Sequence, residues 1–243
     1  MDKNSSTESN KKSILVVSVI GGLLVVIVAV VVGIALYQQS QVIEYEPVPY
    51  PCRPSDPYCA TVDKPMIYLY PATDSEVEVK LGNPEKITTS YPKYDGSWRV
   101  FAKKDGSLED LKTDRKLYGL YWEGVNYPAK QTEEGFIVKG SDSAAFLEEK
   151  LVLLGLNERE SEEFIVYWLP KMEANKYNYV RFDTNEILDE YMPLYVSPKP
   201  DTVIRIAMTF RALDNPIEIR EQELTTPIRD GFVVVEWGGS ELK

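Results

Sequence analysis

The longest apolar run of the chain lies close to its N-terminus. Residues 13–37 read SILVVSVIGGLLVVIVAVVVGIALY and carry no charge. At about 1.5 Å per residue, a helix of this length exceeds the roughly 30 Å hydrocarbon core of a bilayer. A cleaved signal peptide has a shorter apolar region of about 7–15 residues and a small-residue cleavage site, and no such site follows Tyr37. The pattern predicts a transmembrane helix over 13–37, in contact with the lipid bilayer.

The charges that flank this run predict its orientation. Lys3, Lys11 and Lys12 precede it, whereas the first basic residue after it is Arg53. Positively charged residues stay on the cytoplasmic side of a membrane. We therefore expect a cytoplasmic tail over 1–12, a single pass through the cell membrane, and an extracytoplasmic position for the rest of the chain.

Small residues form a stripe along the predicted helix. They are Ser18, Gly22, Ala29 and Gly33, which fall on one face at 3.6 residues per turn. Such a face lets two helices approach closely and suggests a homodimer through the membrane segment. The alternative interpretation is that small residues are simply common in membrane helices, and the sequence leaves both open.

A proline-rich segment over residues 38–63 follows the predicted helix and reads as an extended, semi-rigid stalk. It contains Cys52 and Cys59, the only two cysteines of the chain. Disulfides persist outside the cytoplasm, so we expect these two residues to form a structural disulfide. A redox or metal role would require CxxC spacing or more thiolates.

From residue 64 onward, short apolar runs alternate with turn residues. Within 76–81, for example, Val77, Val79 and Leu81 fall on one face, as in a half-buried strand. By the same criteria the sequence predicts strands at 66–70, 76–81, 86–90, 98–102, 117–122, 177–183, 194–196, 202–212 and 232–237.

Two adjacent helices are predicted after the first group of strands. The first runs to about Leu154, where Gly155 suits a Schellman ending. Asn157 and Glu160 then form a capping box for the second helix, and Pro170 is expected to end or kink it. The acidic residues at the start of this helix are interpreted as a solvated face that complements the helix dipole.

These elements together predict an α+β fold for an extracytoplasmic domain over 64–243. In this fold the helical pair packs against mainly antiparallel strands, and the N-terminal transmembrane helix precedes the domain.

Composition removes several classes of function. Among 243 residues, 38 are acidic and 27 are basic, giving a formal charge of −11. This balance repels phosphate backbones, so nucleic acid is not an expected partner. The chain contains no histidine, which excludes Ser-His-Asp triads, HExxH proteases and histidine-ligated zinc.

Acidic residues next to aromatic ones are the remaining candidates for chemistry. Glu123 follows Tyr121 and Trp122, and Glu236 precedes Trp237. A sugar-binding cleft offers this combination, because rings stack on sugars and carboxylates accept their hydroxyl groups. An edge strand with packed aromatic residues has the same pattern. The candidate catalytic residues are therefore Glu123 and Glu236, and the candidate ligand-binding residues are Tyr121, Trp122 and Trp237.

No motif points to a cofactor or a metal. The chain lacks a DxDxDG calcium loop, a Walker A motif and GxGxxG, so we expect neither cofactor nor metal ligands. Lys64 and Lys199 each precede a proline ahead of a strand and are interpreted as strand punctuation.

Five ordered segments resemble an uncharacterised family of secreted or membrane-anchored bacterial envelope proteins. The segments are KPMIYLYP at 64–71, YPKYDGSW at 91–98, GLYWEG at 119–124, FIVYWLP at 164–170 and SPKPDT at 197–202. The resemblance covers about residues 64–239 and implies a bacterial envelope protein. It implies no activity, fold or catalytic set.

The preferred hypothesis is a non-enzymatic, membrane-anchored module of the cell envelope that binds a wall glycan or a protein partner. The alternative is a carboxylate-dependent hydrolase of envelope glycans, with Glu123 or Glu236 as the acid. Such an enzyme requires two carboxyl groups about 5–10 Å apart across a cleft.

Overall fold

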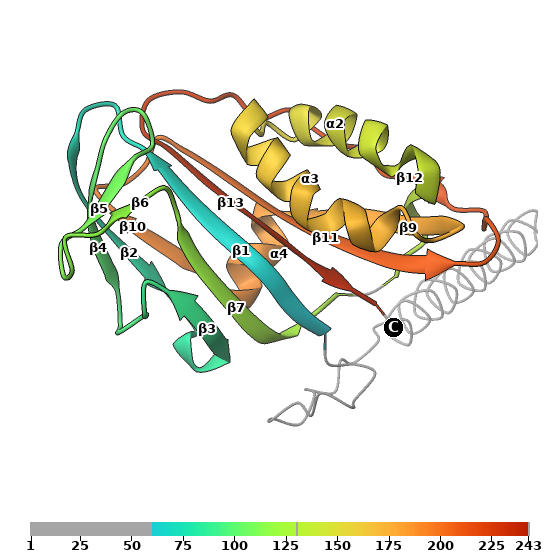
Figure 1. Cartoon of the computed structure of the whole chain (residues 1–243), viewed down its shortest axis with the longest axis horizontal. Helices are drawn as coiled ribbons and strands as arrows, with labels where there is room; N and C mark the ends of the chain where they lie inside the picture. The colour runs from blue at the N-terminus through green and yellow to red at the C-terminus, as the bar shows by residue number, and fades with distance from the viewer. Residues whose placement is uncertain (1–59, 130, 243) are drawn as a thin grey trace, which may run out of the picture. The chain divides into compact units, whose positions relative to one another are not determined.

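The computed structural model describes residues 60–129 and 131–242 (Figure 1). The predicted transmembrane helix over 13–37, its small-residue stripe and the predicted Cys52–Cys59 disulfide lie outside these residues and stay predictions. Within the described part of the chain, no helix is both long and apolar enough to cross a membrane.

The described residues form two β-sheets and three α-helices. In spatial order, the larger, eight-stranded sheet consists of β12 (Arg220–Glu221), β8 (Glu134–Lys139), β9 (Tyr177–Thr184), β11 (Thr202–Leu213), β13 (Val233–Glu241), β1 (Ala60–Tyr70), β7 (Leu120–Tyr127) and β3 (Ile87–Tyr91). The smaller, five-stranded sheet consists of β10 (Leu194–Ser197), β2 (Ser75–Leu81), β4 (Trp98–Ala102), β5 (Leu108–Asp110) and β6 (Lys116–Leu117). The helices are α2 (Ser143–Leu153), α3 (Glu158–Met172) and α4 (Asn185–Tyr191), with 3-10 turns at η1 (Pro84–Lys86) and η2 (Gly140–Asp142).

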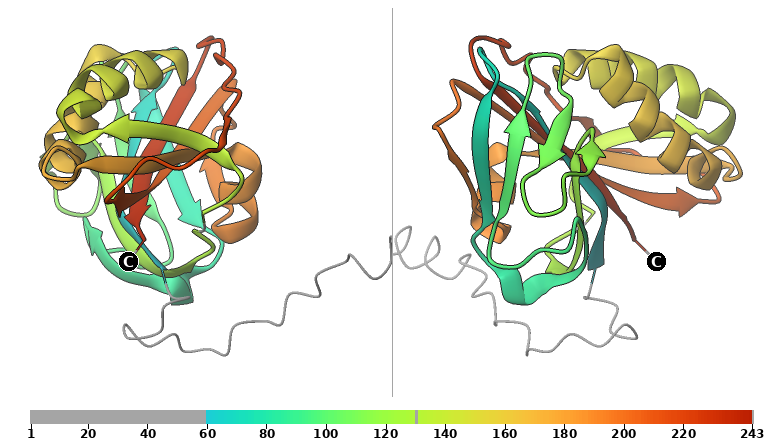
Figure 2. Two further views of the ribbon diagram at one scale, coloured as in Figure 1. Left: turned by 90° about the vertical axis from the view of Figure 1, so that its right-hand side faces the viewer. Right: turned by 60° about the vertical axis from the view of Figure 1, so that its left-hand side comes forward.

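The larger sheet is the middle layer of the domain (Figures 1 and 2). Helices α2 and α3 pack together on one of its faces, and the core beneath them takes residues from β8, β9, β11, β13 and β1. The smaller sheet and α4 pack on the other face around a second core. Because both faces of β11 are covered, residues 204–210 are buried at every position, as in a strand between two layers.

The α+β class expected from the sequence is wrong. The described residues are 45% strand and only 21% helical, so the domain is mainly β. The pattern missed β8 and β5 and the first part of β1, which begins at Ala60 rather than after residue 64. Most neighbouring strands do pair antiparallel, as the pattern implied, but β11 pairs with β13 in parallel over nine residue pairs.

Local signals at the helix junction are confirmed. Gly155 has a φ of 87°, and the Leu156 amide donates to the Leu151 carbonyl at 3.0 Å, which completes a Schellman ending. The capping box of Asn157 and Glu160 forms in both directions. These contacts depend only on neighbours in sequence, which is why the sequence predicted them.

Of the two outcomes expected at Pro170, the end of the helix does not occur there. Helix α3 continues through Pro170 to Met172. Proline removes the hydrogen bond to the carbonyl four residues earlier, which belongs to Val166. Because Val166 is 69% exposed on the outer face of the helix, water can reach that carbonyl, and the helix has only two residues left to form.

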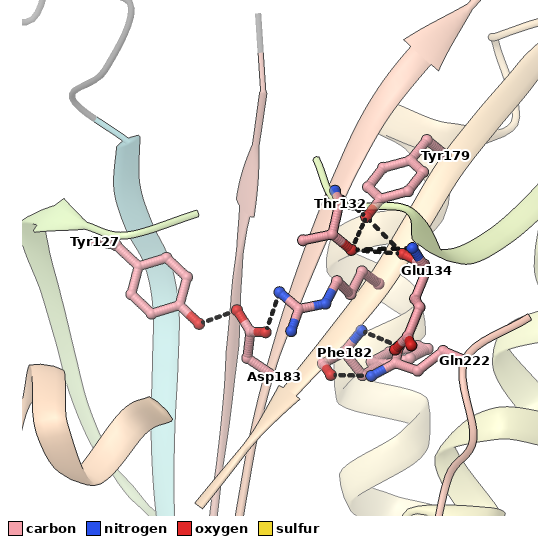
Figure 3. A network of polar contacts seen from close by, with 8 residues as sticks. Tyr127, Thr132, Glu134, Tyr179, Phe182, Asp183 and Gln222 are labelled. Carbon is pink, nitrogen blue, oxygen red and sulfur yellow. Dashed lines mark hydrogen bonds and ion pairs between the residues drawn. The ribbon is translucent and has the colours of Figure 1, made fainter. Parts of the chain in front are cut away.

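A long non-helical connection, residues 214–232, joins the parallel strands β11 and β13; we call it the strap. The Gln222 side chain accepts a hydrogen bond from the Phe182 amide at 2.9 Å and donates to its carbonyl at 2.6 Å (Figure 3). Arg229 binds the fully buried Glu160 at 2.8 Å. Glu160 therefore anchors the strap to α3 instead of lying on the expected solvated face.

Candidate functional site

Four tyrosines gather around a hollow of about 490 Å³ on the helix-bearing face of the larger sheet. Its polar lining comprises Tyr91, Tyr118, Tyr121, Tyr167, Lys64, Lys116 and Glu123. We call this hollow the tyrosine pocket. Its volume lies within the range of ordinary small-molecule sites, about 300–1,000 Å³.

Three neighbouring strands build the floor of the tyrosine pocket. Tyr121 of β7 lies opposite Met66 of β1 on one side and opposite Tyr91 of β3 on the other. Gly119 lies beside Met66, and a Cβ at Gly119 would come within 2.9 Å of the Met66 methyl group. The core beneath α2 and α3 takes no described residue from β3, so the helical pair leaves this end of the sheet open.

One row of α3 residues at four-residue spacing lies beside the pocket, and its last member reaches the lining. The Arg159 guanidinium lies 4.9 Å from the centre of the Tyr118 ring, and Glu163 accepts a hydrogen bond from Tyr68 at 2.9 Å. The next residue in the row, Tyr167, belongs to the pocket lining. Residues four apart project from the same face of a helix, so α3 forms one wall.

Lys64 enters the pocket because of an irregularity in β1. The β1–β13 register shifts between Asp63 and Met66, and Lys64 itself has a φ of 55°. A β-bulge re-aims side chains, and a non-glycine residue in the left-handed region costs about 1–2 kcal/mol. The Lys64 amine lies 5.4 Å from the Tyr167 ring centre. Lys64 lies inside β1, so the interpretation of this residue as punctuation ahead of a strand is wrong.

Glu123 and Tyr121 form a pair inside the pocket. They project from the same face of β7, two residues apart. Burial and the hydrogen-bonded Glu123 carboxylate raise the pKa of Tyr121 above its ordinary value. Tyr121 therefore stays a neutral hydroxyl beside the Glu123 carboxylate, and a carboxylate can accept hydroxyl groups of a ligand.

Tyr91 and Tyr118 form the outer rim of the pocket. Their side chains are 50% and 44% exposed, which is unusual for residues of this size in a domain with two apolar cores. Exposed aromatic rings around a hollow provide flat surfaces on which the C–H faces of a sugar ring can pack.

Trp122 and Glu236 lie in a different environment, on the other face of the sheet. Trp122 is 2% exposed and donates its indole N–H to Glu236 at 2.8 Å. Glu236 also accepts from Arg205 Nε at 2.6 Å, and Arg205 reaches Asp189 of α4 at 2.5 Å. Burial alone lowers the pKa of Arg205, but Glu236 and Asp189 outweigh it and raise that pKa.

This arrangement corrects three of the candidate residues. Trp122 and Trp237 are 2% and 0% exposed, so neither ring can stack on a ligand. Trp237 instead packs in the core beneath the helices, 5.2 Å from the Phe164 ring centre. Glu236 is a buried partner of Arg205, and an acid held in this way is an architectural residue.

The hydrolase hypothesis requires two acids that face each other, and the candidates do not. Glu123 projects into the tyrosine pocket with Tyr121, whereas Glu236 contacts Trp122 on the opposite face of the sheet. Glu123 is the one carboxylate in the lining of the pocket. Among the described residues, no group of three potential ligands is placed to hold a metal ion.

Of the predicted catalytic and ligand-binding residues, the structure thus brings Tyr121 and Glu123 together and separates them from Trp122, Glu236 and Trp237. Sequence reasoning missed Tyr91, Tyr118, Tyr167 and Lys116, which come from β3, the β6–β7 turn, α3 and β6. The usable signal was weak: Tyr91 directly follows the predicted strand 86–90, and Tyr118 lies at the start of the predicted strand 117–122.

Comparisons with protein-family models, with curated proteins and with solved structures found no match for this chain. The resemblance of its five segments to a bacterial envelope family stays a prediction.

Proposed function

We propose that this domain is a non-catalytic binding module of the bacterial cell envelope and that its tyrosine pocket holds a sugar unit of an anionic envelope glycan. The observation that carries the proposal is the gathering of four tyrosines from β3, β7, α3 and the β6–β7 turn around one hollow. The membrane anchor predicted from residues 13–37 would hold the module at the cell surface.

The charges of the pocket support an anionic ligand. Lys64 and Lys116 line it together with a single acid, Glu123. This lining is positive in a chain whose formal charge is −11, so it is distinct from the overall acidic character of the protein. Two ammonium groups beside aromatic faces suit a sugar that carries a carboxylate or phosphate group.

A hydrolase is not the function that these residues favour. The pocket lining supplies one carboxylate, whereas the two-carboxylate mechanisms of most glycosidases need a facing pair. Glu123 is better suited to accept hydroxyl groups of the bound sugar.

Calorimetric titration of the full-length chain, purified in detergent, tests this proposal. The ligands are soluble peptidoglycan fragments and a phosphate-bearing wall polysaccharide, with neutral dextran for comparison. We expect saturable binding of at least one anionic glycan and weaker binding of dextran. Removing one rim ring with Tyr118→Ala should weaken binding about 3- to 10-fold, the usual worth of an aromatic contact.

Tyr195→Ala is the matched control, because Tyr195 is 60% exposed on β10 of the smaller sheet and is not part of the pocket. Equal loss in both variants, or no saturable binding of any anionic glycan, would refute a glycan site in the tyrosine pocket.

A further inference from the structure

A second and larger hollow lies at the β8 edge of the larger sheet. It has a volume of about 1010 Å³ and is enclosed by β8, α2 and residues 216–221 of the strap. We call it the edge groove. It shares no residue with the tyrosine pocket, so its role is independent of the proposed glycan site.

Part of the β8 backbone faces the edge groove without a strand partner among the described residues. The Gly135 carbonyl points away from β9, because it accepts a hydrogen bond from the Gln222 amide of the strap. Backbone groups of a strand alternate in direction with a period of two, so Ile137 and Lys139 also point outward. The pairing of β12 with β8 covers only Glu134 and Gly135.

This pairing also shows that the edge accepts an extended segment. Arg220 and Glu221 add to β8 in parallel as a very short strand, and the strap then leaves the edge to bind Phe182 through Gln222. Beyond Gly135, no described strand is paired with the outward side of β8, although the Lys139 carbonyl accepts a hydrogen bond from the Ser143 hydroxyl at 3.4 Å. An exposed edge of this kind is a template for strand addition.

Apolar side chains line the edge groove beside these backbone groups. Phe136 and Phe146 pack edge to face at 5.3 Å between ring centres, and the Lys150 amine covers Phe136 at 5.0 Å. On the strap side, Ile217 is 37% exposed. Alternate residues of an added strand would pack against these side chains, as they do in pockets that give strand addition its specificity.

The charges around the edge groove determine which segments suit it. Its lining contains four acids, Asp142, Glu149, Glu218 and Glu221, and two bases, Lys139 and Lys150. Lys150 is already paired with Glu149 at 2.8 Å. The rim is therefore acidic, and basic residues flanking apolar ones complement it.

We propose that the edge groove binds an extended segment of a partner protein with alternating apolar and basic residues, which adds as a strand to the outer edge of β8. The segment contributes backbone hydrogen bonds to Ile137 and to the Lys139 amide, apolar side chains to the groove and cations to the acidic rim.

A labelled peptide of about ten alternating lysine and valine residues, long enough to follow β8, is the probe. Its binding to the full-length chain is measured by fluorescence anisotropy, and hydrogen exchange reports on the β8 amides. We expect saturable binding together with slower exchange at Ile137 and Lys139. Two control peptides replace lysine by glutamate or carry N-methyl groups on alternate backbone nitrogens, and both should bind at least about tenfold more weakly.

Two variants locate the interaction. Ile137→Pro removes an outward N–H at an edge position where proline is tolerated, and it should weaken binding about tenfold or more. Glu149→Lys should also weaken binding, whereas Glu148→Lys, an exposed neighbour outside the lining, should not. If Ile137→Pro disturbs the fold, the N-methylated peptide still tests the same hydrogen bonds.

Three results would overturn the proposal. They are no saturable binding of the lysine–valine peptide, equal binding of the N-methylated peptide, and binding without protection of the β8 amides. A concentration-dependent dimer that Ile137→Pro abolishes would identify a second copy of the chain as the occupant and would equally refute a heterologous segment.

Discussion

Tyr121, Trp122 and Glu123 are consecutive on β7, yet they belong to two regions with opposite properties. Tyr121 and Glu123 face the open tyrosine pocket, whereas Trp122 faces the second core and binds the buried Glu236. Both regions combine an aromatic ring with an acid. The difference lies in what covers each face: the smaller sheet and α4 close one, and the helical pair leaves the other open at β3 and β7. The comparison shows that residue type alone does not distinguish a site from a core.

The largest effect is expected where the buried region is broken. Glu236→Ala leaves Arg205, whose side chain is fully buried, without its principal partner. Removing one member of a buried ion pair costs about 3–5 kcal/mol, which urea unfolding would measure. Replacing both residues, Glu236→Leu with Arg205→Met, should recover part of this loss. A cost below about 1 kcal/mol for Glu236→Ala would contradict the assigned role.

Changing adjacent residues of β7 should separate the two regions directly. Trp122→Phe removes a buried donor to a carboxylate and should lower the free energy of unfolding by about 1.5–3 kcal/mol. Its effect on the free energy of glycan binding should be smaller than this effect on stability. Tyr121→Phe removes a hydroxyl in the pocket and should cost no more than about 1 kcal/mol while weakening glycan binding. Urea unfolding and calorimetry on both variants measure these two effects. A larger loss of stability in Tyr121→Phe together with a larger loss of glycan binding in Trp122→Phe would invalidate the comparison.

Alkaline pH should destabilise the domain through its buried tyrosines. Burial, followed by the charge of Asp183, raises the pKa of Tyr127 well above its ordinary value. The unfolded tyrosine loses its proton near pH 10, so above that pH the folded state binds more protons and the free energy of unfolding falls as pH rises, by about 1.4 kcal/mol per unit for one such residue.

An unfolded tyrosine titrates at about pH 10, so urea unfolding from about one pH unit below to one above this value would measure the fall. Tyr127→Phe should make the dependence of the unfolding free energy on pH shallower. The exposed Tyr195 provides the control, because Tyr195→Phe should leave the slope unchanged. A slope that Tyr127→Phe leaves unaltered would exclude Tyr127 as a cause of alkaline sensitivity.

Only a small net effect on stability is expected at Lys64, where two contributions oppose each other. Lys64→Gly relieves the left-handed backbone, worth about 1–2 kcal/mol, but loses the contacts of the amine with the Tyr167 and Trp237 rings, worth about 0.5–1 kcal/mol. The free energy of unfolding should change by no more than about 1.5 kcal/mol. Binding of an anionic glycan should weaken nonetheless, and unchanged binding would remove Lys64 from the site.

Much of the local structure was predictable because it depends on neighbours in sequence. The Schellman ending at Gly155, the capping box of Asn157 and Glu160 and the alternation of Val77, Val79 and Leu81 all formed as expected. Each requires only residues within one helical turn or one strand. The sequence also identified Tyr121 and Glu123 as candidates, because an acid stands beside aromatic residues there.

The class of fold and the completion of the site were decided by tertiary structure. The parallel pairing of β11 with β13 depends on a strap of irregular backbone, which leaves no periodic signal. Whether Trp122 or Tyr121 meets solvent depends on which layer covers each face of the sheet, and those layers come from distant residues. The tyrosine pocket likewise requires Tyr91, Tyr118 and Tyr167 to converge from three separate elements. A local pattern determines which side chains lie on the same face of a strand. Only the packing of distant elements determines whether that face is buried in a core or exposed to solvent.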